Sequence, residues 1–461
     1  QVASDLRDIG RDAQGVWVTQ FRAANLLRLD ADLHAQEARA PAKVEAFVGS
    51  LRAFAPTLAW RTVAGPGGEP YMLHQRAQTS PIELRTNAVS GLSSPYGGGG
   101  PGQVGTATFC QSGVVHTTLT RFGTAGQQPA AMPALPEAVV PVDLSAAPDG
   151  RWLAAVAPGN FVQDVSLMTG SAEARQLFLV APADLPPEGV WRLNETHCLT
   201  TAARLEHQFP GEAVAVHFVD AKTLLVQVRE PAELHVLRLA ADDQPRLAAV
   251  LTLDASTSRD TGHDVFHQNT GTGIACASCH GEALDDAHTW DFGAAGLRRT
   301  QHLRGGVLLF GHYHWSGDLP DFAALIRDVY EQRMGAKPLH ADARDALAQW
   351  LTALPLIPAE ASETPAISRG RALFESAEVG CSTCHAGPLL RSDQRHDVGT
   401  GGPFKVPSLR GVALRLPLMH SGCADSLEER FDPGCGGSAH GNTAQLNSQQ
   451  IADLTAYLRS L

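Results

Sequence analysis

Two pentapeptides of the form C-x-x-C-H stand in the second half of the chain. The residues that define them are Cys276, Cys279, His280, Cys381, Cys384 and His385. Two thiols three residues apart reach the two vinyl groups of one haem, and the adjacent imidazole then ligates the iron from the proximal side. A dithiol redox motif or half of a zinc site would not need a histidine directly after the second cysteine in both places. The sequence therefore predicts two covalently bound haem c groups, with iron ligated by His280 and His385.

The other four cysteines are expected to form disulfides. Haem c is attached outside the cytoplasm, where disulfides persist, so we expect a periplasmic or extracellular protein secreted across the inner membrane. Cys423 and Cys435 are twelve residues apart in a glycine-rich loop, which favours a local bridge. The remaining pair is Cys110 with Cys198, for which two free buried thiols are the alternative.

Length and composition exclude several classes of protein. A chain of 461 residues predicts two to four domains. Hydrophobic residues make up 44%, yet no apolar run approaches the roughly 18 residues of a transmembrane segment, so none is expected. The net charge is −12 and no basic cluster stands out, so nucleic acid is not an expected partner.

Short β-type runs separated by turn residues fill the chain from residue 15 to about 253. Two of them, 142–156 and 213–228, have the form of a strand, a tight turn containing aspartate and a second strand. Repetition of such units predicts an all-β propeller of five to seven blades, with a two-sheet sandwich as the alternative. The segment 93–105 is too rich in glycine to pack a core, and we expect an exposed loop there.

The haem-binding half reads as an internal duplication. His280 and His314 are 34 residues apart, as are His385 and Met419. Each half is expected to end in an amphipathic helix, over 343–354 and 449–461, with a linker between the halves over 355–365. The predicted domains are a β-propeller-like domain over 1–256, a first cytochrome c domain over 257–360 and a second over 361–461.

A short helix, a C-x-x-C-H turn, a long loop and a closing helix with an aromatic residue resemble the mainly α class I cytochrome c fold. More narrowly, the segments 405–411, 420–422 and 426–428, together with Trp315–Asp318, resemble the bacterial di-haem cytochrome c peroxidases. That superfamily also includes di-haem enzymes that oxidise tryptophan in partner proteins. The resemblance implies a calcium ion between the haem domains, while the β half resembles the lactonase-type and quinoprotein-type propellers.

The second axial ligand of each iron decides between electron transfer and chemistry on peroxide. At the place of the class I ligand loop, the two halves offer Met334, 54 residues after His280, and His440, 55 residues after His385. These two are the predicted distal ligands. The residues that compete with them are His288 and His314 for the first haem and Met419 for the second, and an open site is a further alternative.

Two positions depart from the peroxidase pattern. The places of the glutamine and glutamate that serve acid–base cleavage of peroxide hold Leu325 or Ile326, and Arg333. An arginine cannot act as a base. Asp318 and Glu331 are nearby carboxylates that could substitute, although solvated surface charges are the more ordinary interpretation.

Three functions follow from these patterns. The favoured one is an electron carrier whose propeller docks a redox partner protein or a membrane electron-transfer complex. The alternative is a peroxidase-type oxidoreductase that reduces hydrogen peroxide or oxidises a partner protein at the first haem. In the third, the propeller binds a ligand in its central channel. Trp315 either carries electrons between the haems or packs against one of them.

Overall fold

The computed structural model describes residues 4–48, 50–84, 96, 110, 113–123, 129, 132–136, 138–161, 175–185, 192–194, 197–199, 201, 208–254, 256, 260–309, 311–356 and 362–461. Two compact units divide the chain. The first unit comprises Gln1–Gly281 and Val329–His340, and the second comprises Glu282–Asp328 and Ala341–Leu461. Within the described ranges, no helix is both long and apolar enough to cross a membrane.

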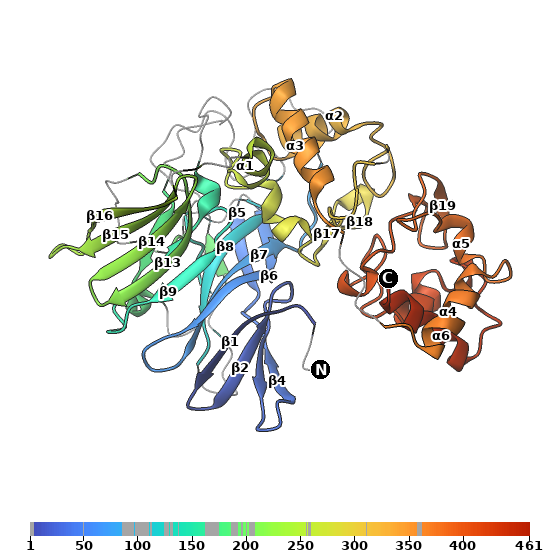
Figure 1. Cartoon of the computed structure of the whole chain (residues 1–461), viewed down its shortest axis with the longest axis horizontal. Helices are drawn as coiled ribbons and strands as arrows, with labels where there is room; N and C mark the ends of the chain where they lie inside the picture. Colours follow the sequence, from blue (N-terminus) through green and yellow to red (C-terminus); the bar gives the residue numbers. More distant parts are fainter. Residues whose placement is uncertain are drawn as a thin grey trace. The chain divides into compact units, whose positions relative to one another are not determined.

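Four sheets build the mostly β first unit (Figure 1). Sheet A is antiparallel, in the order β1 (Leu6–Asp12), β2 (Gly15–Gln20), β3 (Leu26–Leu29), β4 (Ala35–Arg39). Sheet B has the order β12 (Arg192–Asn194), β5 (Val44–Val48), β6 (Ser50–Ala64), β7 (Pro70–Gln78), β8 (Val115–Arg121). Sheet C has the order β11 (Leu177–Val180), β10 (Leu153–Val156), β9 (Asp143–Ala146). Sheet D has the order β13 (Glu212–Asp220), β14 (Thr223–Arg229), β15 (Ala232–Leu239), β16 (Pro245–Asp254).

Both hairpins predicted from the sequence are present. Strands β9 and β10 pair antiparallel, and Gly150 in the turn between them has a φ of 74°, which a side chain would strain. Strands β13 and β14 pair in the same way, and the Asp220 carboxylate accepts hydrogen bonds from the backbone N–H groups of Lys222 and Thr223. Sheets A and D are four-stranded meanders, the strand pattern of a propeller blade. The expected loop at 93–105 lies outside the described residues except for Tyr96.

Alternating apolar residues join sheets C and D. Ala154, Val156, Leu177 and Leu179 of sheet C form one buried cluster with residues of the neighbouring sheet. The members from sheet D are Ala213, Val216, Phe218, Leu224, Val226, Val228, Leu237 and Leu239. The two-residue period of a strand turns these side chains to one face, which is why the sequence pattern predicted the sheets.

Short helices and turns dominate the rest of the chain. The helices are α1 (Thr261–His267), α2 (Phe322–Leu325), the π-helix η7 (Ile326–Arg333), α3 (Ala341–Ala353), α4 (Pro365–Glu375), α5 (Cys381–Cys384) and α6 (Ser448–Arg459). The two-stranded ribbons are β17 (Thr289–Asp291) with β18 (Leu297–Arg299), and β19 (Arg395–Asp397) with β20 (Pro403–Lys405). The 3₁₀ turns are η1 (Pro158–Asn160), η3 (Pro182–Asp184), η4 (Cys276–Ser278), η5 (Gly281–Ala283), η6 (Gly293–Ala295), η8 (Val412–Leu414), η9 (Glu429–Phe431), η10 (Pro433–Cys435) and η11 (Gly437–Ala439). Helices α3 and α6 confirm the two predicted closing helices.

Helices α4 and α6 cross closely within the second unit. A Cβ atom at Gly370 of α4 would lie 1.9 Å from the Asp453 carbonyl oxygen of α6, so only glycine permits this approach. Beside it the rings of Phe374 and Tyr457 meet edge to face, with centroids 5.2 Å apart. Ile367 and Leu454 complete this buried cluster. The crossing holds together the helices that flank the second C-x-x-C-H motif.

The cysteines separate into two sets, as the sequence predicted. Disulfides join Cys110 to Cys198 and Cys423 to Cys435. The four cysteines of the C-x-x-C-H motifs take part in neither disulfide.

Candidate functional site

Helix α5 presents the second C-x-x-C-H motif at the mouth of a cavity. The motif begins after Gly380, whose φ of 80° allows the sharp entry into the helix. The Nδ1–H of His385 donates a hydrogen bond to the Leu390 carbonyl oxygen at 3.0 Å. This bond orients the ring and leaves Nε2 as the nitrogen with a lone pair for a metal. Burial lowers the pKa of His385 to about 4, so the ring is neutral, as a ligand must be.

The cavity beside this motif has a volume of about 350 Å³ and belongs wholly to the second unit. Cys381, Cys384 and His385 line it together with apolar side chains from α4 and α6. Both His440 and Met419, the two sequence candidates for the far-side ligand of the second haem, also line it. The haem-attachment residues and both ligand candidates therefore meet in one place.

The imidazole rings of His385 and His440 are separated by the space that an iron atom needs. Their centroids are 6.2 Å apart and their planes are inclined by 31°. Two metal–nitrogen bonds of about 2 Å each, added to the roughly 1.1 Å from nitrogen to ring centre on either side, come to about 6 Å. Nδ1 of His440 is buried, without a hydrogen-bond partner among the described residues. Burial, with the nearby Arg430 charge, lowers the pKa of His440 to about 3, so this ring is also neutral. The residues present fit a haem.

Met419 has different surroundings. Its backbone φ is 70°, and its side chain packs against an apolar cluster of the second unit that includes Leu418 and Cys435. Met419 therefore both packs against this cluster and lines the cavity. The ring geometry favours His440 over Met419 as the partner of His385.

Trp315 also contributes to the cavity wall. Its indole N–H donates to the Arg299 carbonyl oxygen at 2.8 Å, and its ring centroid lies 6.3 Å from that of His420. His420 stacks in turn on Phe404, with centroids 3.8 Å apart. Trp315 therefore lies in the wall of the cavity beside the second C-x-x-C-H motif.

The first C-x-x-C-H motif belongs to the first unit, together with Met334. Thr272 donates a hydrogen bond to the Met334 carbonyl oxygen at 2.6 Å and ties Met334 to the loop before Cys276. Met334 is buried, with 3% of its surface exposed. The competing candidates His288 and His314 belong to the second unit. His314 is engaged with the Asp318 carboxylate at 3.2 Å.

The π-helix η7 places a tyrosine beside this motif. Tyr330 is 2% exposed, and burial raises the pKa of its hydroxyl, with a further contribution from the Cys276 thiol. The Gln268 side chain lies near enough to lower the pKa in part, but forms no hydrogen bond of normal geometry with this hydroxyl. A π-helix often marks a functional site, because the extra residue per turn redirects side chains. Sequence periodicity did not single out Tyr330.

Arg333 and Asp318, at or near the positions that serve peroxide cleavage in the di-haem peroxidases, are engaged with other side chains. The Arg333 guanidinium donates to the Tyr96 hydroxyl at 3.2 Å. Asp318 accepts a hydrogen bond from the Ser316 hydroxyl at 2.5 Å and pairs with His314. Burial alone would raise the pKa of Asp318, but these two partners bring it below its usual value. Asp318 is therefore an ionised partner of His314, not a base poised near neutral pH.

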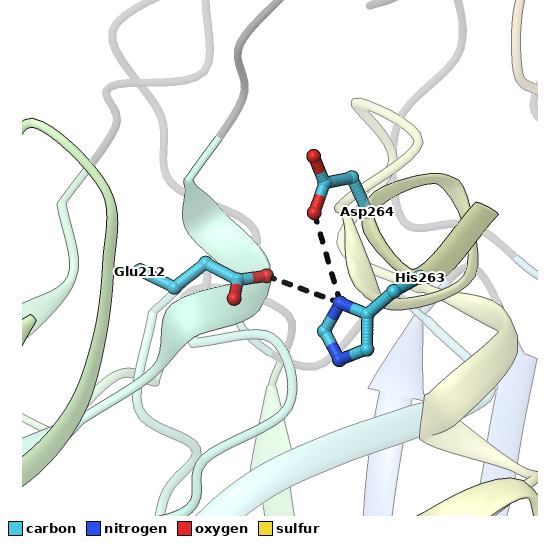
Figure 2. Close-up of side chains that lie close together, drawn as sticks. All are labelled: Glu212, His263 and Asp264. Atoms are coloured by element: carbon cyan, nitrogen blue, oxygen red, sulfur yellow. Dashed lines mark ion pairs between the residues drawn. The ribbon is translucent and has the colours of Figure 1, made fainter. Parts of the chain in front are cut away.

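A second group of ligand-type side chains lies in the first unit and was missed from the sequence. Figure 2 shows the carboxylates of Glu212 (β13) and Asp264 (α1) both directed at Nδ1 of His263, which is 3.8 Å from the first and 3.7 Å from the second. The guanidinium of Arg229 is 2.5 Å from the Glu212 carboxylate and contacts both ring nitrogens of His263. The Arg229 guanidinium therefore occupies the position that a metal cation would take among these three side chains. No local spacing signals this group, since Glu212 and His263 are 51 residues apart.

Residues 367–461 match the cytochrome c family. The chain ends in a cytochrome c domain. Such a domain carries covalently bound haem c, so the protein has a haem-based redox function.

Two relatives share sequence with this chain. Hydrazine synthase subunit gamma of Kuenenia stuttgartiensis is 26% identical over 254 residues, covering 41% of this chain and 72% of the relative. Methylamine utilization protein MauG of Methylorubrum extorquens is 29% identical over 119 residues, covering 20% of this chain and 33% of the relative. A solved MauG-like protein associated with microbial copper homeostasis is 21% identical, with a TM-score of 0.35 over 46% of this chain and 91% of that chain.

Proposed function

We propose that this protein is a periplasmic or extracellular di-haem c-type cytochrome that relays single electrons between its two haems and a redox partner. The partner is a protein or a membrane electron-transfer complex, and the β-rich region docks it as a propeller. The two disulfides and the haem c chemistry support the location. The observation that carries the proposal is the distance of 6.2 Å between the imidazole ring centroids of His385 and His440.

The residues that would hold the second haem are Cys381 and Cys384 as thioether anchors, with His385 and His440 as axial ligands. Those for the first are Cys276 and Cys279, with His280 and Met334. Bound haem supplies a reversible one-electron couple. With an axial ligand on each face, the protein would block the position that peroxide or oxygen needs. Leu390 holds the His385 ring in place through its carbonyl group, which limits rearrangement during electron transfer.

Replacement of His440 tests the second site, and Met419→Ala is the matched control from the same cavity wall. We expect two haems per chain by the pyridine haemochrome assay in both variants, because thioether attachment does not need the distal ligand. Electron paramagnetic resonance of the oxidised protein should show a low-spin signal that His440→Ala converts to high spin and Met419→Ala leaves in place. The reverse pattern would assign the ligand to Met419, and an unchanged signal in His440→Ala would contradict the proposal.

The alternative is a peroxidase-type enzyme that reduces hydrogen peroxide, or oxidises a partner protein, at the first haem. The buried Tyr330 hydroxyl beside Cys276 favours it, since this O–H group has no hydrogen bond of normal geometry among the described residues. One relative, hydrazine synthase subunit gamma, is named as part of an enzyme, which supports an enzymatic function in general. One equivalent of hydrogen peroxide separates the two functions. Two low-spin signals indifferent to peroxide support the carrier, whereas a high-spin signal that peroxide consumes supports the enzyme.

A further inference from the structure

Arg415 follows the turn η8 and lines the cavity of the cytochrome c domain. One of its Nη atoms donates a hydrogen bond to the Ser408 carbonyl oxygen. Its Nε is buried and has no hydrogen-bond partner among the described residues. A guanidinium group has five N–H donors, so this arginine has unused hydrogen-bonding capacity in a buried place.

Arg415 forms no ion pair with a carboxylate among the residues that the structure describes. Asp285 acts on Arg415 electrostatically, but its carboxylate is bound by Arg299 at 2.7 Å. Arg299 also repels Arg415, and both guanidinium groups interact with the Asp285 carboxylate. Burial lowers the pKa of Arg415 to about 10, which leaves it charged at neutral pH.

The rest of the cavity lining is also cationic. Among the described residues that line it, the charged ones other than histidine are Arg299, Arg304, Arg391, Asp397, Lys405, Arg415 and Arg430. The lining therefore has six cations and one carboxylate, in a chain whose net charge is −12. Two of these cations have carboxylate partners outside the lining, since Arg299 pairs with Asp285 and Arg391 with Asp393. A ligand that enters this cavity should bring negative charge, and the two propionates of a haem do so in the planar form that an arginine binds best.

We propose that Arg415 binds a propionate of the haem attached at Cys381 and Cys384 and raises the midpoint potential of that haem. The inference rests on attachment of haem at this motif, but not on a second haem or on the relay. A fixed positive charge near the haem stabilises the reduced form, which carries one positive charge fewer than the oxidised form. Loss of the guanidinium should therefore shift the couple toward the oxidised form.

Spectroelectrochemical titration of the full-length protein tests this effect. Arg415→Leu removes the charge, Arg415→Lys keeps the charge but loses the planar fork, and Arg459→Leu removes a surface charge outside the cavity as the matched control. We expect Arg415→Leu to favour the oxidised form of the low-spin haem at least tenfold, which for a one-electron couple is about 59 mV. Arg415→Lys should shift the potential less, and Arg459→Leu should match the wild type.

Resonance Raman spectra supply a second readout, because propionate bending bands respond to a lost hydrogen bond. If Arg415→Leu does not mature, altered bands in Arg415→Lys still support the proposal, and unaltered bands with an unchanged potential overturn it. Equal potentials in Arg415→Leu and Arg459→Leu, with haem content preserved, also overturn it. A haemochrome value of one haem per chain would refute the di-haem relay while leaving this result interpretable.

Discussion

Replacement of Gly370 by alanine tests how the cytochrome c domain is held together. The added Cβ would lie 1.9 Å from the Asp453 carbonyl oxygen and 2.9 Å from the Tyr457 Cβ. A backbone oxygen cannot swing aside as the end of a side chain can, so α4 and α6 must separate. Both helices contribute cavity-lining residues, Phe374 from α4 and Leu454 and Leu458 from α6. Their separation therefore loosens the haem site as well as the helix pair.

The size of the effect follows from two opposing contributions. Overpacking of a core costs about 1–3 kcal/mol, and a clash with backbone belongs at the upper end. Alanine in a helix is more favourable than glycine by roughly 0.5–1 kcal/mol, which acts in the other direction. The net loss of about 2 kcal/mol should lower the Tm of the cytochrome c domain, residues 367–461, by roughly 10 °C.

Thermal unfolding monitored by Soret circular dichroism measures the change at the haem. Gly434→Ala is the matched control, because a Cβ there would have no atom within 4 Å. We expect Gly434→Ala to unfold at or slightly above the wild-type temperature. A Gly370→Ala variant as stable as Gly434→Ala would refute the argument that the helix crossing requires glycine.

Two further predictions concern the disulfide and the pH dependence. Replacement of both Cys423 and Cys435 by alanine should cost about 2–3 kcal/mol in chemical unfolding, because the bridge closes a loop of 12 residues. Reduction of the wild type should cost more than this, because it also opens the Cys110–Cys198 bridge. His74 is buried, donates to the Gln75 carbonyl oxygen and accepts from the Thr120 hydroxyl, and burial lowers its pKa to about 4. Since the unfolded chain binds this proton first, stability should fall as the pH drops from about 6.5 to 4, by up to roughly 3 kcal/mol. His74→Gln should flatten that part of a pH–stability curve, and an unchanged slope would show that other groups dominate.

Features encoded by adjacent residues were predictable from the sequence. The C-x-x-C-H motifs need only five residues and one turn to place two thiols and an imidazole. Their chemistry can therefore be predicted without knowledge of the tertiary structure. The hairpins at 142–156 and 213–228 follow from alternating apolar residues on either side of turn residues, which is also local information. The Cys423–Cys435 bridge was predictable because a short glycine-rich loop brings its ends together.

Features that join distant residues depended on tertiary structure. The spacing from His385 made His440 the predicted ligand, with Met419 as a competitor. Only the tertiary structure places the His385 and His440 rings with their centroids 6.2 Å apart. The Arg229, Glu212 and His263 contacts, and the position of Arg415 in the cavity wall, have no signature in local periodicity. Side chains dozens of residues apart come into contact only when the helices and sheets pack together. The charges around each side chain are then set by residues that are distant in the sequence, so local sequence patterns do not predict them.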